Sequence, residues 1–358
     1  MNFHGGNIYD YSNIKYDFSS NINPLGVPDN YKKAICENIG MFTKYPDIEY
    51  RELIKRIKRY LGDLELNVLL GNGAVELIHS IIANSGFDTL YSMSPTFSEY
   101  KRAAQNNNID YHEIPCYYDK YSKLDIDVLL GEVKDNSLVI LCNPNNPTGY
   151  YINSQYMKYI AEKLNEKNCN LIIDEAFIEF TDDYPHSSFI PKLYGYPNVT
   201  IIRAMTKFYG MPGIRLGYAV TSDKKLWTRV RQNQQPWNIN TAAVIAGYTV
   251  LEDVEYIDKS RNWIKAERAF LYKGLSNIKH LNVAPSKANF HLLKIEKEGM
   301  DAYSLRDLLV NEGILIRIPE GFDSLTANHF RLAVLDRKSN LALLSALNNI
   351  LEKDSYEV

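Results

Sequence analysis

The sequence predicts an α/β fold, with a large domain built on a mainly parallel sheet and a smaller α+β domain after it. Five short segments, most of them apolar and rich in β-branched residues, are typical of strands, and helix-like stretches separate several of them. With 358 residues, the chain is also too long for one simple core. The strand-like segments lie at residues 89–91, 110–114, 138–142, 170–174 and 199–202.

The pattern changes near residue 252. A long amphipathic helix is expected there, followed by three strand-like segments and a closing helix, at 254–275, 291–295, 314–318, 329–334 and 338–352. We therefore expect three parts: an N-terminal arm with part of the small domain at 1–45, a large domain at 46–252 and a C-terminal small domain at 253–358.

Composition and charge argue against several kinds of partner. The net charge of −3 gives no electrostatic basis for nucleic-acid binding, and no segment is apolar enough to span a bilayer. The four cysteines lack the spacing of a zinc site or a disulfide framework, which favours a reducing compartment. Because the N-terminus also lacks the apolar stretch of a signal peptide, we expect a cytoplasmic protein without a metal site.

Residues 1–28 are rich in Gly, Asn, Ser and Pro, which predicts extended and turn structure. Such a segment can be a disordered tail or an arm that reaches into a site. The glycines that follow His4 favour the arm, because they let a backbone approach a ligand closely. Helices are expected next, at 29–38 and 47–61.

A strand beginning at Asn67 is followed by a Gly71-Asn72-Gly73 turn and an amphipathic helix. The first N–H groups of that helix would be free to bind an anion. The turn is not a Walker loop, and it lacks the third glycine of a dinucleotide fingerprint. Considered alone, it is more typical of architecture than of a ligand site.

Polar residues follow three of the predicted parallel strands, where ligands gather in such sheets. Residues 143–149 follow one strand, Asp174 ends the next, and Lys207 follows a third. Considered singly, Lys207 could be an exposed loop lysine, and Asp174 with Glu175 could bind a metal or cap a helix. Lys207, however, begins a run with two glycines and a proline between the strands predicted at 199–202 and 215–221, which constrains its position.

Four segments together resemble the class I/II aminotransferase family of fold-type I pyridoxal 5'-phosphate (PLP) enzymes. They are Asn146-Pro-Thr-Gly, Asp174-Glu-Ala-Phe, Thr206-Lys207 and Arg215, in that order on a parallel α/β frame. The resemblance covers essentially the whole chain and implies the PLP-dependent transferase fold, with the cofactor in the large domain. It also implies a covalent bond between Lys207 and PLP, and an Asp174 carboxylate that keeps the pyridine nitrogen protonated.

The same resemblance implies further contacts with the cofactor. Asn146 would hydrogen-bond the phenolic oxygen, and Phe97 would stack on the ring, although ordinary core packing also explains an aromatic residue there. Tyr45 matches a tyrosine that reaches the phosphate across a dimer interface, so the resemblance implies a homodimer. The phosphate would otherwise be held by Arg215, Thr206 and the backbone of Gly73, Ala74 and Val75.

Within this family, residues 4–7, 17–26 and 206–218 resemble the threonine-phosphate decarboxylases of cobalamin biosynthesis. Phe177 also stands where the aminotransferases usually have a tyrosine that bonds the cofactor. The resemblance implies decarboxylation of a phosphorylated amino acid, O-phospho-L-threonine, to (R)-1-aminopropan-2-yl phosphate. The implied substrate contacts are His4, Gly5, Asn21, Asn146, Arg317 and Arg331, whose guanidinium groups suit carboxylate and phosphate.

Departures from the family pattern leave the substrate open. Ala204 stands where the family often has Ser or Thr, Leu335 replaces a glycine, and Ile318-Pro319 follows Arg317 in place of a polar pair. A histidinol-phosphate-type aminotransferase and a phosphoserine decarboxylase would share these parts, and which anion each arginine binds is not decided. A regulator that keeps the fold as a PLP-binding module is a different class, but only about 28 residues precede the first predicted helix, too few for a DNA-binding domain.

Overall fold

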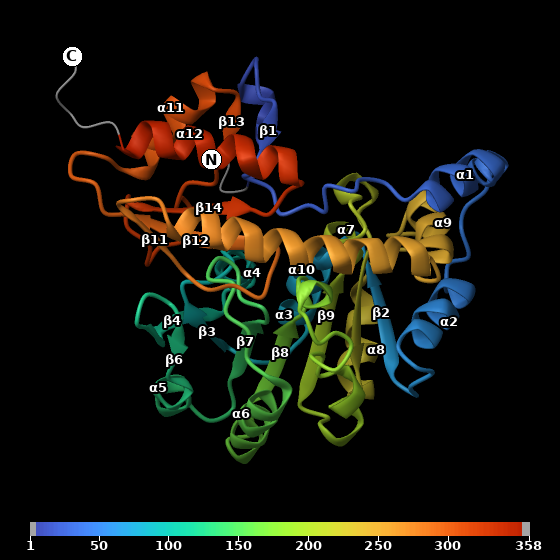
Figure 1. Cartoon of the computed structure of the whole chain (residues 1–358). Helices are drawn as coiled ribbons and strands as arrows, with labels where there is room; N and C mark the ends of the chain where they lie inside the picture. Colours follow the sequence, from blue (N-terminus) through green and yellow to red (C-terminus); the bar gives the residue numbers. More distant parts are fainter. Residues whose placement is uncertain (1–4, 353–358) are drawn as a thin grey trace.

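The computed structural model describes residues 5–352 of the chain. Its centre is a seven-stranded sheet with helices packed around it, and a smaller domain lies over one edge of that sheet (Figure 1). The long helix α10 (Val254–Ser276) runs along the boundary between the two parts (Figure 1). This architecture confirms the predicted fold class.

The large sheet is parallel apart from one strand, β10, which is antiparallel to both of its neighbours. The sequence predicts that strand but not its direction. Its connection to the preceding strand contains only two short helical turns, α7 (Met205–Phe208) and the 3-10 helix Pro212–Ile214, so the chain reverses beside that strand. In spatial order the strands are β2 (Asn67–Gly71), β10 (Gly217–Thr221), β9 (Val199–Ala204), β8 (Asn170–Asp174), β7 (Leu138–Cys142), β3 (Thr89–Ser94) and β4 (Asp110–Pro115).

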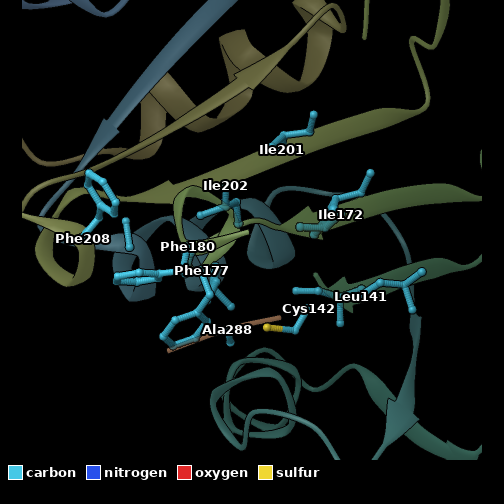
Figure 2. Close-up of a cluster of buried hydrophobic side chains, with 14 of the residues drawn as sticks. Leu141, Cys142, Ile172, Phe177, Phe180, Ile201, Ile202, Phe208 and Ala288 are labelled. Atoms are coloured by element: carbon cyan, nitrogen blue, oxygen red, sulfur yellow. The ribbon is translucent and has the colours of Figure 1, made fainter. Parts of the chain in front are cut away.

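The central strands β7, β8 and β9 are buried on both faces because they consist almost entirely of apolar residues. Their side chains form a dry cluster with the phenyl rings of Phe177, Phe180 and Phe208 (Figure 2). In the register of the sheet, Asp174 lies opposite both Cys142 and Ile202, so the three strands end nearly level. Polar residues that follow these strands therefore meet at one edge of the sheet.

In this part of the chain, the helices expected at 29–38 and directly after Gly73 lie close to their predicted positions. The helix expected at 47–61 begins later, because Tyr50 takes a left-handed conformation and the Asp47 carboxylate accepts hydrogen bonds from the N–H groups of Glu49 and Arg51. None of the described helices is both long and apolar enough to cross a membrane. The helices are α1 (Asp29–Glu37), α2 (Arg51–Tyr60), α3 (Ala74–Ala83), α4 (Glu99–Asn106), α5 (Ile126–Glu132), α6 (Ser154–Glu166), α8 (Lys224–Asn233) and α9 (Thr241–Val250).

The small domain contains a three-stranded antiparallel sheet of β11 (Leu281–Val283), β12 (Phe290–Ile295) and β14 (His329–Ala333). Helices α11 (Ala302–Asn311) and α12 (Arg337–Glu352) belong to it as well. The strand expected at 314–318 is regular only in β13 (Ile314–Leu315), which pairs in parallel with β1 (Tyr16–Asp17) of the N-terminal arm. The arm thus enters the small domain before it crosses to the large one.

Candidate active site

A cavity of about 420 Å³ lies at the carboxyl ends of β7, β8 and β9, between them and the small domain. Most of the residues that the sequence singled out line it. The large domain contributes Ala74, Val75, Phe97, Asn146, Asp174, Thr206, Lys207 and Arg215, and the arm and small domain contribute Gly5, Asn21, Arg317 and Arg331. Segments from both ends of the chain therefore meet at one site.

Asp174 ends β8, and its carboxylate is buried in the cavity wall. Its Oδ1 accepts a hydrogen bond from the Ala176 N–H at 3.0 Å, and its Oδ2 accepts one from the Tyr100 hydroxyl at 2.8 Å. No cationic side chain of the described residues forms an ion pair with it, and burial raises its pKa to about 6. The carboxylate is therefore suited to a cationic group brought by a ligand.

Lys207 lies in α7, directly after β9. Within the described part of the chain, its ammonium group makes no hydrogen bond or ion pair. Burial, and then the positive charges of Arg331 and Arg215, lower its pKa to about 8. A lysine in this state releases its proton near neutral pH and becomes a nucleophile.

The turn before α3 forms an anion site with Arg215. Gly73 precedes the helix without a side-chain cap, so the first N–H groups of α3 are free to bind a ligand. The Arg215 Nη2 donates to the Asn72 carbonyl at 3.3 Å, and a Cβ on Gly73 would lie 2.4 Å from that nitrogen. Gly73 does not line the cavity itself, but its missing side chain and its φ of +81° let the guanidinium group pack against the turn. Helix N–H groups beside an arginine favour a phosphate.

Arg317 and Arg331 are direct partners in a β-bridge, in which the N–H of each donates to the carbonyl of the other at 3.1 and 2.8 Å. Both side chains are only 6% exposed. Burial lowers the pKa of Arg317 to about 10 and that of Arg331 to about 9, and the charge of Arg317 contributes to the second shift. Two positive charges held side by side in a cavity favour an anionic ligand.

Arg331 is held by Asn146 and by the arm. Its Nη1 donates to Asn146 Oδ1 at 2.5 Å, and its Nη2 donates to the Ser19 carbonyl at 2.9 Å. Its buried Nε and the buried Oδ1 of Asn21 have no hydrogen-bond partner among the residues from 5 to 352. Because unpaired buried polar atoms cost free energy, these two atoms indicate that a ligand or ordered water completes their hydrogen bonds.

The N-terminal arm forms one wall of the site and is no disordered tail over its described residues. Gly5 packs on Ser19 so closely that a Cβ would lie 2.1 Å from the Ser19 carbonyl oxygen. Further along, the buried Asn23 amide donates two hydrogen bonds of 2.7 Å, one to α7 and one to α10. His4, which was predicted to contact the substrate, lies outside the described residues.

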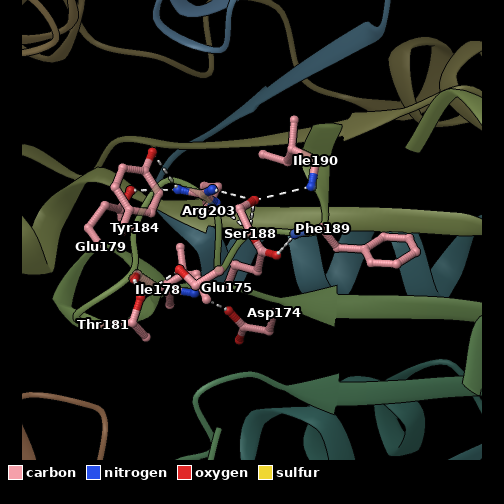
Figure 3. A network of polar contacts seen from close by, with 12 residues as sticks. Asp174, Glu175, Ile178, Glu179, Thr181, Tyr184, Ser188, Phe189, Ile190 and Arg203 are labelled. Atoms are coloured by element: carbon pink, nitrogen blue, oxygen red, sulfur yellow. Dashed lines mark hydrogen bonds and ion pairs between the residues drawn. The ribbon is translucent and has the colours of Figure 1, made fainter. Parts of the chain in front are cut away.

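A buried ion-pair network supports the loop that follows Asp174 (Figure 3). Arg203 of β9 donates to Glu175 and to Glu179 at 2.8 Å each, and to the Ser188 hydroxyl at 2.9 Å. Glu175 does not line the cavity, so it supports the loop and does not form a metal site with Asp174. The network ties the loop after Asp174 to the strand that leads to Lys207.

Tyr45 and Phe177 differ in their positions relative to the cavity. Tyr45 does not reach the cavity of its own chain, because its side chain is 78% exposed and stacks on Trp237 with 4.5 Å between ring centroids. Its contact with a cofactor in a second subunit is still a prediction. Phe177 does line the cavity and packs edge-on against Phe290 at 5.1 Å, and its ring can donate no hydrogen bond there.

The cavity also contains residues that sequence reasoning missed. The Phe322 ring lies against the Arg317 guanidinium at 5.5 Å, and an ion pair between Lys101 and Asp323 joins its loop to α4. No motif marks these residues, whereas Ser19 and Ser20 could have been found from their place beside Asn21. The missed lining residues include Ser19, Ser20, Ser98, Glu99, Arg102, Cys142 and Phe322.

Comparison with known proteins places this geometry in a family. The family model described as "Aminotransferase class I and II" matches residues 13–347. The chain belongs to the class I and II aminotransferases.

Its relatives include members with two different names. It is 34% identical to the threonine-phosphate decarboxylase of Salmonella typhimurium over 97% of this chain and 96% of that one. It is 32% identical to histidinol-phosphate aminotransferase 2 of Haemophilus influenzae, over 93% and 89%. The crystal structure of the histidinol-phosphate aminotransferase from Clostridium acetobutylicum superposes with a TM-score of 0.89 at 37% identity, and covers 95% of this chain and 100% of that one.

Class I and II aminotransferases use PLP, so this protein is a PLP-dependent enzyme. The residues present fit the cofactor. Asp174 is a buried carboxylate without a cationic partner among the described residues, which suits a protonated pyridine nitrogen. Lys207 has a lowered pKa, so more of it is the neutral amine that can react with the aldehyde of PLP. The turn at Gly73, with Arg215, suits the phosphate.

Proposed function

We propose that this protein decarboxylates O-phospho-L-threonine to (R)-1-aminopropan-2-yl phosphate, the aminopropanol component used in cobalamin biosynthesis. The observation that carries the proposal is the pair of buried guanidinium groups of Arg317 and Arg331 in the cavity that contains Lys207. A phosphoamino acid presents a carboxylate and a phosphate together, which matches two adjacent cations. The similarity to the Salmonella typhimurium enzyme adds support.

In this proposal each side chain near the cofactor has one task. When bound, PLP supplies an aldehyde that captures an amine and a ring that accepts an electron pair from Cα. The ionised Asp174 carboxylate would accept a hydrogen bond from the protonated ring nitrogen. Lys207 carries a proton on Nζ and delivers it to Cα of the substrate after the bond to the carboxylate breaks and CO₂ leaves. One proton thus replaces one CO₂ at Cα.

The two arginines orient the substrate. With Asn146 they would hold the carboxylate and phosphate and so fix which bond at Cα is positioned to break. Contacts that stabilise the carboxylate equally in the substrate and in the transition state do not accelerate the reaction. The contacts from the arginines must therefore orient the carboxylate more than they stabilise it. The unpaired Oδ1 of Asn21 can only accept a hydrogen bond, so its predicted contact would be with an N–H of the substrate and not with an anionic oxygen.

Transamination of histidinol phosphate is the second candidate, favoured by the 37% identity to the Clostridium acetobutylicum structure. The same cations could bind its phosphate and then the carboxylates of glutamate. Decarboxylation of O-phospho-L-serine is a close variant, because a single methyl group separates that substrate from phosphothreonine and is worth about 1–3 kcal/mol.

A substrate panel tests the proposal. The PLP-loaded protein is given phosphothreonine, phosphoserine, and histidinol phosphate with 2-oxoglutarate, and kcat/KM is measured for each. We expect the highest value for phosphothreonine, roughly 10- to 100-fold above phosphoserine. The highest value for histidinol phosphate would overturn the proposal in favour of transamination.

We further propose that two copies of the chain form a homodimer in which Tyr45 reaches the cofactor of the other subunit. Support comes from a segment of exposed apolar side chains around Tyr45, which a second copy would cover. They are Ile39, Phe42, Tyr45, Ile48 and Trp237.

A further inference from the structure

Tyr100 connects two residues that the proposed function places against the cofactor ring. It lies in α4, and its side chain is completely buried. Its hydroxyl donates to Asp174 Oδ2 at 2.8 Å, and its ring packs edge-on against Phe97 with 5.7 Å between centroids. Tyr100 does not line the cavity, so it can act on a ligand only through these neighbours.

The Tyr100 hydroxyl is one of two hydrogen-bond donors to the Asp174 carboxylate among the described residues. The other is the Ala176 N–H, which reaches Oδ1. A carboxylate has about four acceptor positions, so both oxygens keep a free position. Burial and the Asp174 charge raise the pKa of Tyr100 well above its usual range, so its proton stays on the phenol and the hydrogen bond is always donated to Asp174.

Loss of this bond would act on Asp174 in a defined direction. The bond favours the ionised carboxylate, whereas burial favours the neutral acid. Without it, Asp174 becomes a stronger base and its carboxylate is held only by the Ala176 N–H among the described residues. A proton shared between Asp174 and a pyridine nitrogen then moves toward Asp174.

We propose that Tyr100 is a positioning residue that keeps Asp174 ionised and correctly turned, and thereby keeps the ring nitrogen of the bound cofactor protonated. This inference rests on the proposed role of Asp174 as the partner of that nitrogen. Tyr100 would then influence how strongly the cofactor ring withdraws electrons, although it touches neither cofactor nor substrate. It holds whichever of the two candidate reactions the enzyme performs.

The Tyr100→Phe variant tests the inference, because it removes the hydroxyl and keeps the ring that packs on Phe97. Tyr111→Phe is the matched control: Tyr111 also donates to a carboxylate, Glu113 Oε1 at 2.9 Å, but its hydrogen bond lies outside the cavity. The readout is the ¹⁵N chemical shift of the ring nitrogen of ¹⁵N-labelled PLP bound to each protein, measured without substrate.

We expect the protonated shift in the wild type and in Tyr111→Phe, and a shift toward neutral pyridine in Tyr100→Phe. With the preferred substrate, kcat of Tyr100→Phe should fall roughly 10- to 100-fold, as expected for loss of a hydrogen bond to a charged group, with KM unchanged. A folded Tyr100→Phe protein with the wild-type ¹⁵N shift would overturn the inference. If the wild type itself shows a neutral ring nitrogen, the proposed role of Asp174 is wrong, which is a different outcome.

Discussion

Lys207 has an unusual acid–base environment for a lysine, because it is partly buried near the positive charges of Arg331 and Arg215. With a pKa of about 8, the reactive neutral amine predominates above about pH 8 and the ammonium form below it. We predict that the rate at which cofactor-free protein bonds PLP covalently rises with pH and levels off above about pH 8. Visible absorbance after rapid mixing measures this rate.

Lys207→Ala is the control for that measurement and should give no covalent adduct at any pH. A rate that still rises steeply beyond about pH 10, as for an exposed lysine, would contradict the argument from burial. An adduct in Lys207→Ala would show that another amine is the site of attachment.

At the scale of single residues, the sequence predicts the parts of the site that follow strands. Lys207, Asp174 and Asn146 stand in short motifs whose distance from a strand is fixed, and the structure brings them together. Tyr100 could not be predicted in the same way. Its contact with Asp174 joins residues 74 positions apart and depends on how α4 packs against β8.

The turn between β2 and α3 makes a prediction at the scale of one element. In Gly73→Ala the new Cβ would meet the Arg215 Nη2 at 2.4 Å, so the guanidinium group must leave the phosphate site. We predict that the dissociation constant for PLP rises at least about tenfold, by loss of a charge-assisted hydrogen bond. Titration of the cofactor-free protein measures this constant.

The Gly86→Ala variant distinguishes the effect of backbone strain from the effect of the steric contact with Arg215. Gly86 has a φ of +83°, close to that of Gly73, but nothing lies within 4 Å of the position of its Cβ. Both variants place an alanine at a positive φ and should therefore lose stability, by about 1–3 kcal/mol, and only Gly73→Ala should lose PLP affinity. Equal affinities in the two variants would refute the role of this turn in binding phosphate.

The network around Arg203 makes a prediction about stability (Figure 3). Arg203→Met leaves the buried carboxylates of Glu175 and Glu179 without their cation. We predict a loss of about 3–5 kcal/mol in the free energy of unfolding, measured by urea denaturation. Lys259→Met is the comparison, because the Lys259–Glu255 pair is largely exposed and solvent-screened and should contribute far less stability. A loss of similar size in both variants would contradict this account of the network.

At the scale of elements, apolar patterns predict most of the sheet, because buried strands need unbroken runs of aliphatic residues. They could not predict the antiparallel direction of β10, which depends on a short connection. They also could not predict that β1 of the arm pairs with β13, because β1 has only two residues and no recognisable pattern.

For the whole molecule, the proposed homodimer makes a prediction about shared sites. Tyr45→Ala and Lys207→Ala should each be weakly active or inactive alone. A mixture refolded together should regain activity, because one site of each hybrid dimer combines an intact Tyr45 from one subunit with an intact Lys207 from the other. No recovery in hybrids whose formation is confirmed by sedimentation would show that Tyr45 does not act across the interface.

The most direct test of the proposed reaction follows the carboxyl carbon of the substrate. The PLP-loaded protein is incubated in ²H₂O with phosphothreonine labelled with ¹³C in its carboxyl group, first without a keto acid and then with 2-oxoglutarate. We predict one ¹³CO₂ for each substrate consumed in both cases, and one deuterium at the carbon that was Cα. Glutamate formation from 2-oxoglutarate, with the ¹³C label retained in the organic product, would contradict decarboxylation.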